Sequence, residues 1–230
     1  MSSSAIDLDA VSVRLGEATA LEDVTLRVDA SRIAVIGENG SGKSTFARVV
    51  AGQIPASSGR VSVLGLDPVR QSGALRPRVA MVFSNPDAQI VMPTVAEDVA
   101  FSLRPERLRT AELNARVAEA LSEFGLTELA GRSAHELSGG QKQLLALCGA
   151  VIRRPELVIA DEPTAALDAR NSRRIADHLF AETGHRLLIV THDLDLAARC
   201  DVVVLFAEGR VSQVGEPDAV IAEYEASLRC

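Results

Sequence analysis

Hydrophobic and polar residues alternate near the start of the chain, as they do in β-strands that bury one face. The alternating apolar positions are Ile6, Leu8, Val11, Val13, Val24, Leu26 and Val28. Gly16-Glu17 interrupts this series and is a turn signal. We therefore predict a small antiparallel β layer at the N-terminal end of the chain.

Further along, short continuous apolar runs replace the alternation. Such runs are typical of parallel strands that are buried on both faces. Such runs predict strands over residues 33–36, 78–83, 157–160, 186–191 and 202–206, and strand patterns interrupted by polar residues occur over 60–64 and 211–214. Helical patterns lie between several of them, so we expect an α/β protein with a parallel sheet.

Residues 85–154 differ from the rest because they contain no good strand pattern. A capping-box pattern opens a helix over residues 94–103. A second helix is expected over residues 110–124, where apolar residues recur on one stripe. We predict one domain whose core, residues 1–84 and 155–230, carries a helical subdomain, residues 85–154.

The composition fits a large globular domain. Of the 230 residues 47% are hydrophobic and 24% are charged, which is ample for a core. The formal net charge of −7 disfavours general attraction to nucleic acid. No apolar run approaches the roughly 20 residues of a transmembrane helix, and residues 1–4 lack the regions of a signal peptide. Cys148, Cys200 and Cys230 follow no metal-ligand spacing, so free thiols are expected.

The strongest local signal is a glycine-rich segment between a predicted strand and a predicted helix. Its residues are Gly37, Glu38, Asn39, Gly40, Ser41, Gly42, Lys43, Ser44 and Thr45. The glycines let backbone N–H groups turn into one concavity, and the helix N-terminus adds partial positive charge. Lys43 can neutralise the β- and γ-phosphates, and the Ser44 hydroxyl can ligate Mg²⁺. This pattern predicts a phosphate loop that binds a nucleoside triphosphate.

An acidic pair and a histidine follow two of the other apolar runs. Asp161 is expected at the carboxyl edge of the sheet, where phosphoryl-binding loops gather, and can hold Mg²⁺. Glu162 points elsewhere and can polarise a water for in-line attack. His192 emerges at the same edge and can contact the γ-phosphate or the attacking water. The candidate catalytic residues are Glu162, His192 and Lys43.

A second glycine-bearing turn comprises Ser138, Gly139, Gly140 and Gln141. Ser138 and Gln141 have capping-box spacing, so a well-capped helix is one explanation of the turn. Capping does not explain two glycines in the first helical turn, where they weaken a helix. Glycines there expose backbone N–H groups that suit an anion. Asp168, further along the chain, is equally consistent with a helix N-cap.

Five ordered segments together resemble the ATPase subunits of ABC transporters. They are GENGSGKST at 37–45, LSGGQ at 137–141, LVIADEP at 157–163, AALD at 165–168 and THD at 191–193. The resemblance extends over essentially the whole chain, and LSGGQ distinguishes this family from other phosphate-loop ATPases. It implies a P-loop NTPase (RecA-like) core with an N-terminal antiparallel β layer and an inserted α-helical subdomain, and it implies ATP and Mg²⁺ as cofactors.

The resemblance also implies a role for each matching residue. These roles are phosphate binding by Lys43 with the Gly40 and Gly42 backbone, Mg²⁺ binding by Ser44 and Asp161, base catalysis by Glu162, and a switch-histidine role for His192. Ser138, Gly139 and Gly140 would close over the γ-phosphate of ATP held by a partner subunit. Because the chain has one phosphate loop and one LSGGQ, two composite sites imply a head-to-tail homo- or heterodimer.

Residues 82–91 and 93–101 narrow the resemblance to the energy-coupling-factor group, which powers bacterial uptake of vitamins and metal ions. Within it the similarity is greatest to ATPases of biotin uptake, with those of cobalt and nickel uptake as alternatives. In this group the ATPase is peripheral, at the cytoplasmic face of the cell membrane. It docks on a transmembrane coupling protein, while a separate integral membrane protein captures the substrate.

Two positions depart from the family pattern. The family usually has Gln, a Mg²⁺ ligand and sensor of the membrane partner, where this chain has Ser84. A serine hydroxyl could reach the metal only through water, so the link between docking and hydrolysis is expected to differ. Gln89 is nearby but corresponds to another family position. Leu15 replaces an aromatic that often stacks on adenine, so weak base selectivity is expected.

Two other classes of protein can carry such a phosphate loop. Soluble ABC-type ATPases that act on DNA or the ribosome usually fuse two ATPase halves or insert long coiled coils, and this chain has neither. A nucleotide-binding regulator without turnover would not need Glu162 and His192. The sequence therefore favours an ATP-hydrolysing motor subunit of an importer.

Overall fold

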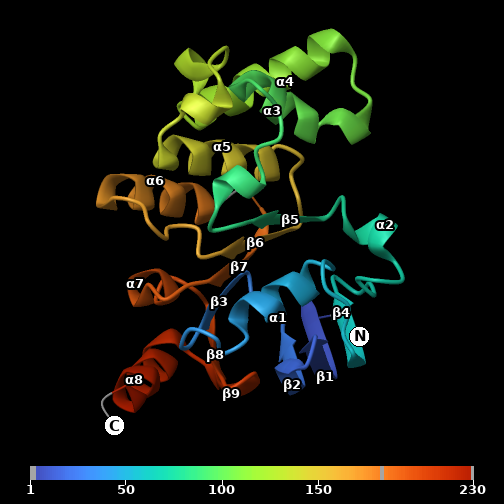
Figure 1. The fold of residues 1–230 in the computed structure, drawn as a ribbon, viewed down its shortest axis with the longest axis vertical. Helices are drawn as coiled ribbons and strands as arrows, with labels where there is room; N and C mark the ends of the chain where they lie inside the picture. The colour runs from blue at the N-terminus through green and yellow to red at the C-terminus, as the bar shows by residue number, and fades with distance from the viewer. Residues whose placement is uncertain (1–3, 182–183, 229–230) are drawn as a thin grey trace. The chain divides into compact units, whose positions relative to one another are not determined.

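A computed structural model of the chain describes residues 4–181 and 184–228. Within it the chain forms two compact bodies, which Figure 1 shows with their elements labelled. The first body comprises residues 1–79 and 186–230, and the second comprises residues 80–185.

The first body contains an antiparallel layer and a mostly parallel one. The antiparallel layer has the strand order β2-β1-β4, formed by β1 (Ile6–Leu15), β2 (Ala18–Val28) and β4 (Ser58–Val63). The other has the order β7-β3-β8-β9, formed by β7 (Arg186–Val190), β3 (Arg32–Ile36), β8 (Val202–Ala207) and β9 (Arg210–Gly215). Strand β3 is parallel to β7 and β8, and β9 is antiparallel to β8. The helices of this body are α1 (Lys43–Val50), α2 (Ser72–Leu75), α7 (Leu194–Ala197) and α8 (Pro217–Ser227).

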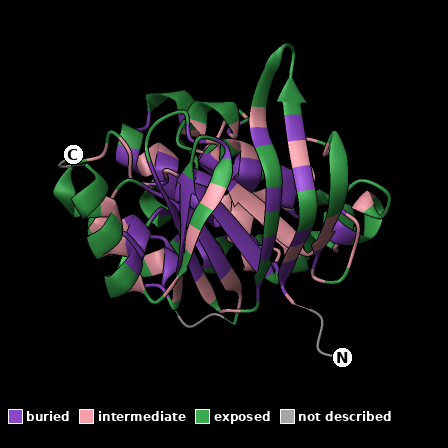
Figure 2. Cartoon of the chain, turned by 90° about the horizontal axis from the view of Figure 1, so that it is seen from below, coloured by how far each residue is buried: buried purple, intermediate pink, exposed green. Residues whose placement is uncertain are grey.

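These layers confirm the two patterns seen in the sequence. In β1, Ile6 and Leu8 are buried, whereas Asp7 between them is half-buried and Asp9 beyond them is exposed. In β3 and β7 every residue after the first is buried, as expected for strands covered on both faces. Figure 2 shows the same contrast between alternating and continuously buried strands.

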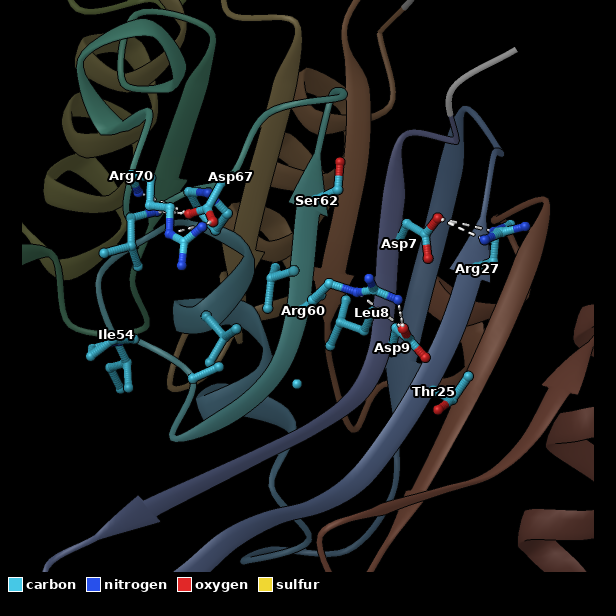
Figure 3. A pocket seen from close by; sticks show the side chains of 17 residues that line it. Asp7, Leu8, Asp9, Thr25, Arg27, Ile54, Arg60, Ser62, Asp67 and Arg70 are labelled. Carbon is cyan, nitrogen blue, oxygen red and sulfur yellow. Dashed lines mark hydrogen bonds and ion pairs between the residues drawn. The ribbon is translucent and has the colours of Figure 1, made fainter. Parts of the chain in front are cut away.

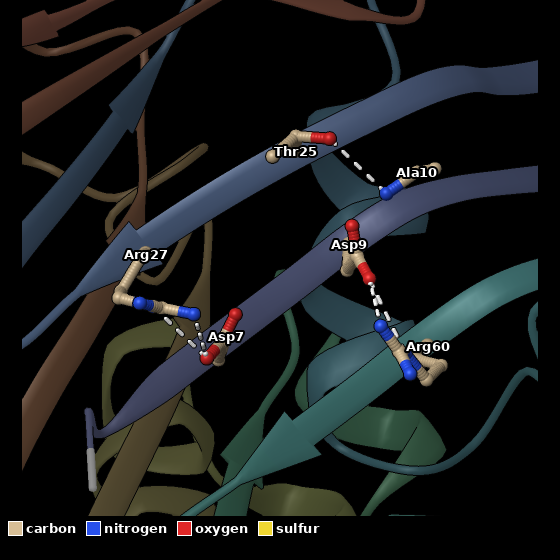
Figure 4. Close-up of polar contacts among 6 residues, drawn as sticks. All are labelled: Asp7, Asp9, Ala10, Thr25, Arg27 and Arg60. Atoms are coloured by element: carbon tan, nitrogen blue, oxygen red, sulfur yellow. Dashed lines mark hydrogen bonds and ion pairs between the residues drawn. The ribbon is translucent and has the colours of Figure 1, made fainter. Parts of the chain in front are cut away.

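Two cross-strand ion pairs help to set the register of the antiparallel layer (Figure 4). Asp7 lies opposite Arg27 and pairs with it at 3.0 Å, and Asp9 lies opposite Arg60 and pairs with it on the other side. Opposite charges that face each other across antiparallel strands contribute roughly 0.2–1 kcal/mol. The pairs are largely solvent-exposed, so each adds little to the unfolding free energy. Their main effect is to favour this register of the strands over others.

The same side chains line an open groove of about 880 Å³ in the first body (Figure 3). Its far wall includes Asp67 and Arg70, which also form an ion pair. The three arginines of this groove are thus matched by three aspartates. No surplus charge is left to attract a phosphate group.

The second body contains β5 (Val79–Val82) and β6 (Leu157–Asp161), which are neighbouring strands. Its helices are α3 (Val95–Ser102), α4 (Thr110–Glu123), α5 (Gly139–Val151) and α6 (Ala169–Leu179), with short 3-10 turns at Pro86–Ala88, Arg104–Glu106, Thr127–Leu129 and Ala134–Glu136. Residues 85–154, all of which the structure describes, contain helices and no strand. The helical subdomain with these bounds stays a prediction, since the second body also includes β6 and α6.

The thiols that the structure describes are buried. Cys148 and Cys200 form no disulfide, and burial raises the pKa of each to about 12. A thiol with such a pKa stays protonated and unreactive at neutral pH. Cys230, which is expected to be a free thiol, lies outside the described residues. So do residues 1–3, which belong to the segment expected to lack the regions of a signal peptide. No helix in the described part of the chain is long and apolar enough to cross a membrane.

Helices α4 and α6 are joined by an aromatic contact. Phe124, at the end of α4, stacks on His178 of α6 with ring centroids 4.1 Å apart and an interplanar angle of 13°. Arg174 of α6 donates a hydrogen bond to the Phe124 carbonyl oxygen at 3.3 Å. Burial lowers the pKa of His178 below its ordinary value of 6.5, against an opposing effect of Glu123.

We predict that acid weakens the second body through His178. Because its pKa is lower in the folded chain, the unfolded chain binds the proton first as the pH falls through about 6.5. The stability is therefore full above that pH and declines below it. His178→Gln should reduce the difference in unfolding free energy between about pH 7.5 and pH 5.5, measured by urea denaturation. His135→Gln, at an exposed position, serves as the control, and equal pH slopes in all three proteins would contradict the prediction.

Candidate functional site

The residues predicted for the nucleotide site are divided between the two bodies. The phosphate loop, residues 37–45, and His192 belong to the first body. Asp161, Glu162, Ser84 and the signature turn, residues 138–141, belong to the second. Each half of the predicted site has a distinct local geometry.

The phosphate loop connects β3 to α1 through backbone that favours glycine. Gly37, Gly40 and Gly42 have φ values of 138°, 83° and 101°. A Cβ atom on Gly37 would lie 2.1 Å from the carbonyl oxygen of Phe206. One on Gly42 would lie 2.7 Å from that of Ala20. These two glycines are therefore required by close backbone contacts as well as by their φ values.

Lys43 is folded back over this loop. Its side chain is buried, and Nζ donates hydrogen bonds to the carbonyl oxygens of Gly37 and Glu38, both at 2.7 Å. Lys43 is also the first residue of α1, whose N-cap is Gly42. A lysine charge and a helix N-terminus thus act at the same place, which is the arrangement that binds phosphate groups. Ser41 Oγ is buried there and has no hydrogen-bond partner among the described residues.

His192 lies at the sheet edge where the phosphate loop begins. Val190 of β7 is the register partner of Val35 in β3, and the Thr191 N–H donates to the Val35 carbonyl at 3.1 Å. His192 follows Thr191 directly, just as the phosphate loop directly follows β3. His192 is exposed, and Asp193 caps α7 through its side-chain oxygen. The sequence predicts that His192 emerges at the same edge as Asp161, and this stays a prediction.

Two further features of the first body border the loop. A hollow of about 430 Å³ is lined by residues 38–41, by residues 205–208 and by Tyr224 of α8. Burial, and then the charge of Glu38, raise the pKa of Tyr224. Sequence reasoning missed Tyr224, since α8 comes last in the chain and has no pattern that links it to the loop. Leu15, which is 46% exposed, lies at the end of β1 opposite Ala18.

The acidic pair ends β6 in the second body. Asp161 is only 6% exposed, whereas Glu162 is partly exposed and has a φ of 50°. A positive φ at a residue other than glycine costs roughly 1–3 kcal/mol and is concentrated at functional sites. That Glu162 points away from Asp161 and polarises a water stays a prediction.

The loop that follows β5 is held by two glutamines. Gln89 accepts from the Phe83 N–H at 2.8 Å and donates to the Met81 carbonyl at 2.9 Å. Gln143 of α5 is 2% exposed and donates to the Phe83 carbonyl at 3.0 Å. Ser84 thus follows a residue whose backbone groups are both fixed by side chains. Lys142, next to Gln143, adds an ion pair with Asp87 at 2.7 Å.

The signature turn forms the capping box that its sequence predicts. Ser138 Oγ accepts from the Gln141 N–H, and the Gln141 side chain accepts from the Ser138 N–H at 2.9 Å. The two glycines differ from each other. A Cβ on Gly139 would meet nothing within 4 Å, whereas Gly140 is buried against Asn171. The expectation that both glycines expose their backbone therefore applies to Gly139 alone.

Asp168 is the N-cap of α6, as one of its two sequence interpretations predicted. Its carboxylate accepts from the Asn171 N–H at 2.9 Å and from the Asn171 side chain at 2.8 Å. The backbone hydrogen bond from Asn171 is the main reason why the pKa of Asp168 is lowered.

The donor set fits magnesium bound together with a triphosphate. Among the described residues no group of three or more His, Cys, Asp or Glu side chains is arranged to hold a metal ion. Mg²⁺ prefers oxygen ligands and is usually bound by one or two carboxylates with substrate phosphates and waters. Asp161 and the hydroxyl of Ser44, which directly follows Lys43, are ligands of this kind.

The chain is similar to known proteins over most of its length. Residues 21–165 match the family model described as ABC transporter. The chain is 41% identical to the biotin transport ATP-binding protein BioM of Rhizobium etli, over 95% of this chain and 97% of that protein. It is 45% identical to the energy-coupling factor transporter ATP-binding protein EcfA1 of Symbiobacterium thermophilum, over 89% of this chain and 73% of that protein.

A solved structure shares the fold. It is cbiO1 from Clostridium perfringens, described as part of the ABC transporter complex cbiONQ. The TM-score is 0.85 at 31% identity, and the match covers 98% of this chain and 93% of that one. The predicted α/β fold class is therefore confirmed.

We predict that Gln143 stabilises the loop after β5. Gln143→Leu keeps a side chain of similar size but leaves the Phe83 carbonyl without its donor, which should cost about 1–3 kcal/mol of unfolding free energy. Lys142→Leu is the matched control, because its ion pair involves the exposed Asp87 and should be worth less than about 1 kcal/mol. Chemical denaturation measures both variants, and equal losses would contradict the prediction.

Proposed function

This chain belongs to the ABC transporter family of ATPases, and from that premise we propose that it is the motor subunit of an energy-coupling-factor importer for biotin. Its relatives BioM and EcfA1 and the shared fold of cbiO1 support the importer class. The local observation that carries the proposal is Lys43, a buried ammonium held at a helix N-terminus inside a glycine cradle. Such a cradle binds the phosphates of ATP, which the ATPase hydrolyses.

We propose that the two bodies contribute complementary chemistry to hydrolysis. Lys43 and the loop N–H groups bind the β- and γ-phosphates, and Ser44 with Asp161 holds Mg²⁺, which neutralises phosphate charge when bound. Glu162 takes the proton of the attacking water. His192, at the edge where the loop begins, contacts the γ-phosphate or that water. Leu15 gives adenine an apolar contact without an aromatic face, so selectivity for the base is weak.

We further propose that two ATPase subunits, identical or related, form a head-to-tail dimer. The chain has one phosphate loop and one signature turn. The turn of each subunit would close over ATP held by the other, with Gly139 as the glycine that leaves its backbone open to the γ-phosphate. Asp168 would lie beside the same nucleotide. Two sites per dimer follow from this symmetry.

The proposed membrane partner is a transmembrane coupling protein, which places this subunit at the cytoplasmic face of the membrane. Val91 and Phe101 are large apolar side chains with exposures of 61% and 42%. Asp98 accepts hydrogen bonds from the N–H groups of Val91 and Met92, so the turn before α3 is fixed to the helix that bears Phe101. An apolar helix of the coupling protein fits such a surface. A separate membrane protein would capture the substrate.

The identity of the substrate can be tested by purifying the capture protein together with this chain. We expect the chain to copurify from its own cells with two integral membrane proteins and no nucleic acid, and the complex to take up labelled biotin in vesicles when ATP is inside. Uptake of cobalt or nickel in place of biotin would assign it to the metal importers. Copurification with DNA or ribosomes would overturn the importer assignment.

We predict that Glu162→Gln abolishes turnover and preserves nucleotide binding. Removal of a general base lowers the rate by roughly 10²–10⁴-fold, whereas the phosphate contacts of Lys43 remain. Steady-state ATPase rates and equilibrium ATP binding measure the two effects. Lys43→Ala is the contrasting variant and should lose binding itself. A Glu162→Gln protein that hydrolyses ATP at the wild-type rate would remove the proposed base.

We predict that Ser84→Gln strengthens the response to the membrane partner. The longer amide would be able to contact a bound Mg²⁺ without an intervening water. One added contact should raise the ratio of stimulated to basal ATPase by roughly fivefold, or about 1 kcal/mol. Ser122→Gln, on the exposed side of α4, controls for the added side chain. If stimulated and basal rates change by the same factor, Ser84 does not take part in coupling.

A further inference from the structure

The side chain of Asn171 lies against the second glycine of the signature turn. A Cβ atom on Gly140 would be 2.4 Å from Asn171 Cγ, 2.5 Å from Nδ2 and 2.7 Å from Oδ1. Contacts that short force a shift, so any side chain at residue 140 would have to displace the Asn171 amide from its place. Gly139, one residue earlier, has nothing within 4 Å of the corresponding position.

The other side of Asn171 is fixed to Asp168. The Asn171 N–H and the Asn171 Nδ2 donate to different oxygens of that carboxylate, at 2.9 and 2.8 Å. The side-chain amide is thus held by one hydrogen bond to Asp168, its own backbone N–H is bonded to the same carboxylate, and the amide packs against the Gly140 backbone. Little rotation of the amide is possible without loss of one contact or the other.

We infer that Asn171 is a positioning residue for ATP hydrolysis, which fixes the signature turn and the Asp168 loop to each other so that both reach the partner subunit's nucleotide together. This inference rests on the proposed function, in which both segments act on ATP held by the other subunit. Asn171 itself touches neither the nucleotide nor the water. It acts by keeping the two N-termini, those of α5 and α6, in one fixed arrangement.

The physical reason is the demand on geometry in a composite site. Displacement of a positioned group by about 1 Å can cost roughly 100-fold in rate. A turn and a loop that were free to shift independently would have to be ordered anew each time the dimer closed. A rigid link between them removes that cost from the closure step.

A double-mutant cycle tests the Gly140–Asn171 contact. Gly140→Ala should lower the ATPase kcat by at least roughly tenfold and lower the melting temperature, because the new methyl group displaces the amide. Asn171→Ala makes room for that methyl group, so the double variant should have the kcat and melting temperature of Asn171→Ala alone. Asn171→Asp keeps the volume and must fail to rescue Gly140→Ala. Gly139→Ala is the matched glycine control, and its effect should multiply with that of Asn171→Ala.

A second measurement separates positioning from mere packing. Asn171→Ala should lower kcat by roughly tenfold and leave equilibrium ATP binding by the subunit's own phosphate loop unchanged, since the link acts on the partner's nucleotide. Wild-type kcat in Asn171→Ala, weakened ATP binding that accounts for the loss, or a Gly140→Ala defect that Asn171→Ala does not rescue would overturn the inference. If Gly140→Ala fails to fold, rescue of folding by Asn171→Ala tests the contact, and the kcat of Asn171→Ala tests the positioning role. Failure of the proposed function is recognised separately, by a wild-type protein that neither dimerises with ATP nor hydrolyses it.

Discussion

The approach of the Phe206 carbonyl to residue 37 constrains the nucleotide half of this protein. With 2.1 Å between that oxygen and the place of a Cβ atom, only glycine lets the chain leave β3 and turn back over its own end. The turn then brings the carbonyl oxygens of Gly37 and Glu38 within reach of Lys43. The position of the buried ammonium and the start of α1 follow from this one turn.

In the second body, hydrogen bonds to the backbone of one residue fix a whole loop. Its loop after β5 is held through the backbone groups of Phe83, one bonded to Gln89 and the other to Gln143. Because Gln143 is two residues beyond the signature turn on the same helix, a displacement of the loop is transmitted to α5 with few intervening atoms. Under the proposed function, a membrane protein that docked beside the loop would therefore have a short mechanical route to the signature turn.

The sequence was informative wherever a pattern is local. Alternation at Ile6 and Leu8 predicted the antiparallel layer, and the strand–glycine–helix order predicted the loop that ends in Lys43. The capping boxes at Thr94 and Ser138 were both found. In each case the residues that make the contact are neighbours in the chain, so their spacing is sufficient evidence.

Contacts between distant segments could not be predicted in this way. Nothing in the spacing of residues connects Asn171 with Gly140, or Tyr224 with Glu38, because those pairs meet only after the helices have packed. The glycines of the signature turn show the consequence most clearly. In the sequence both glycines look equally suited to binding an anion. In the structure Gly140 is packed against Asn171, whereas Gly139 has no neighbour at its Cβ position. A motif shared by a family can thus combine two physical demands, and only the neighbours of each residue show which demand it meets.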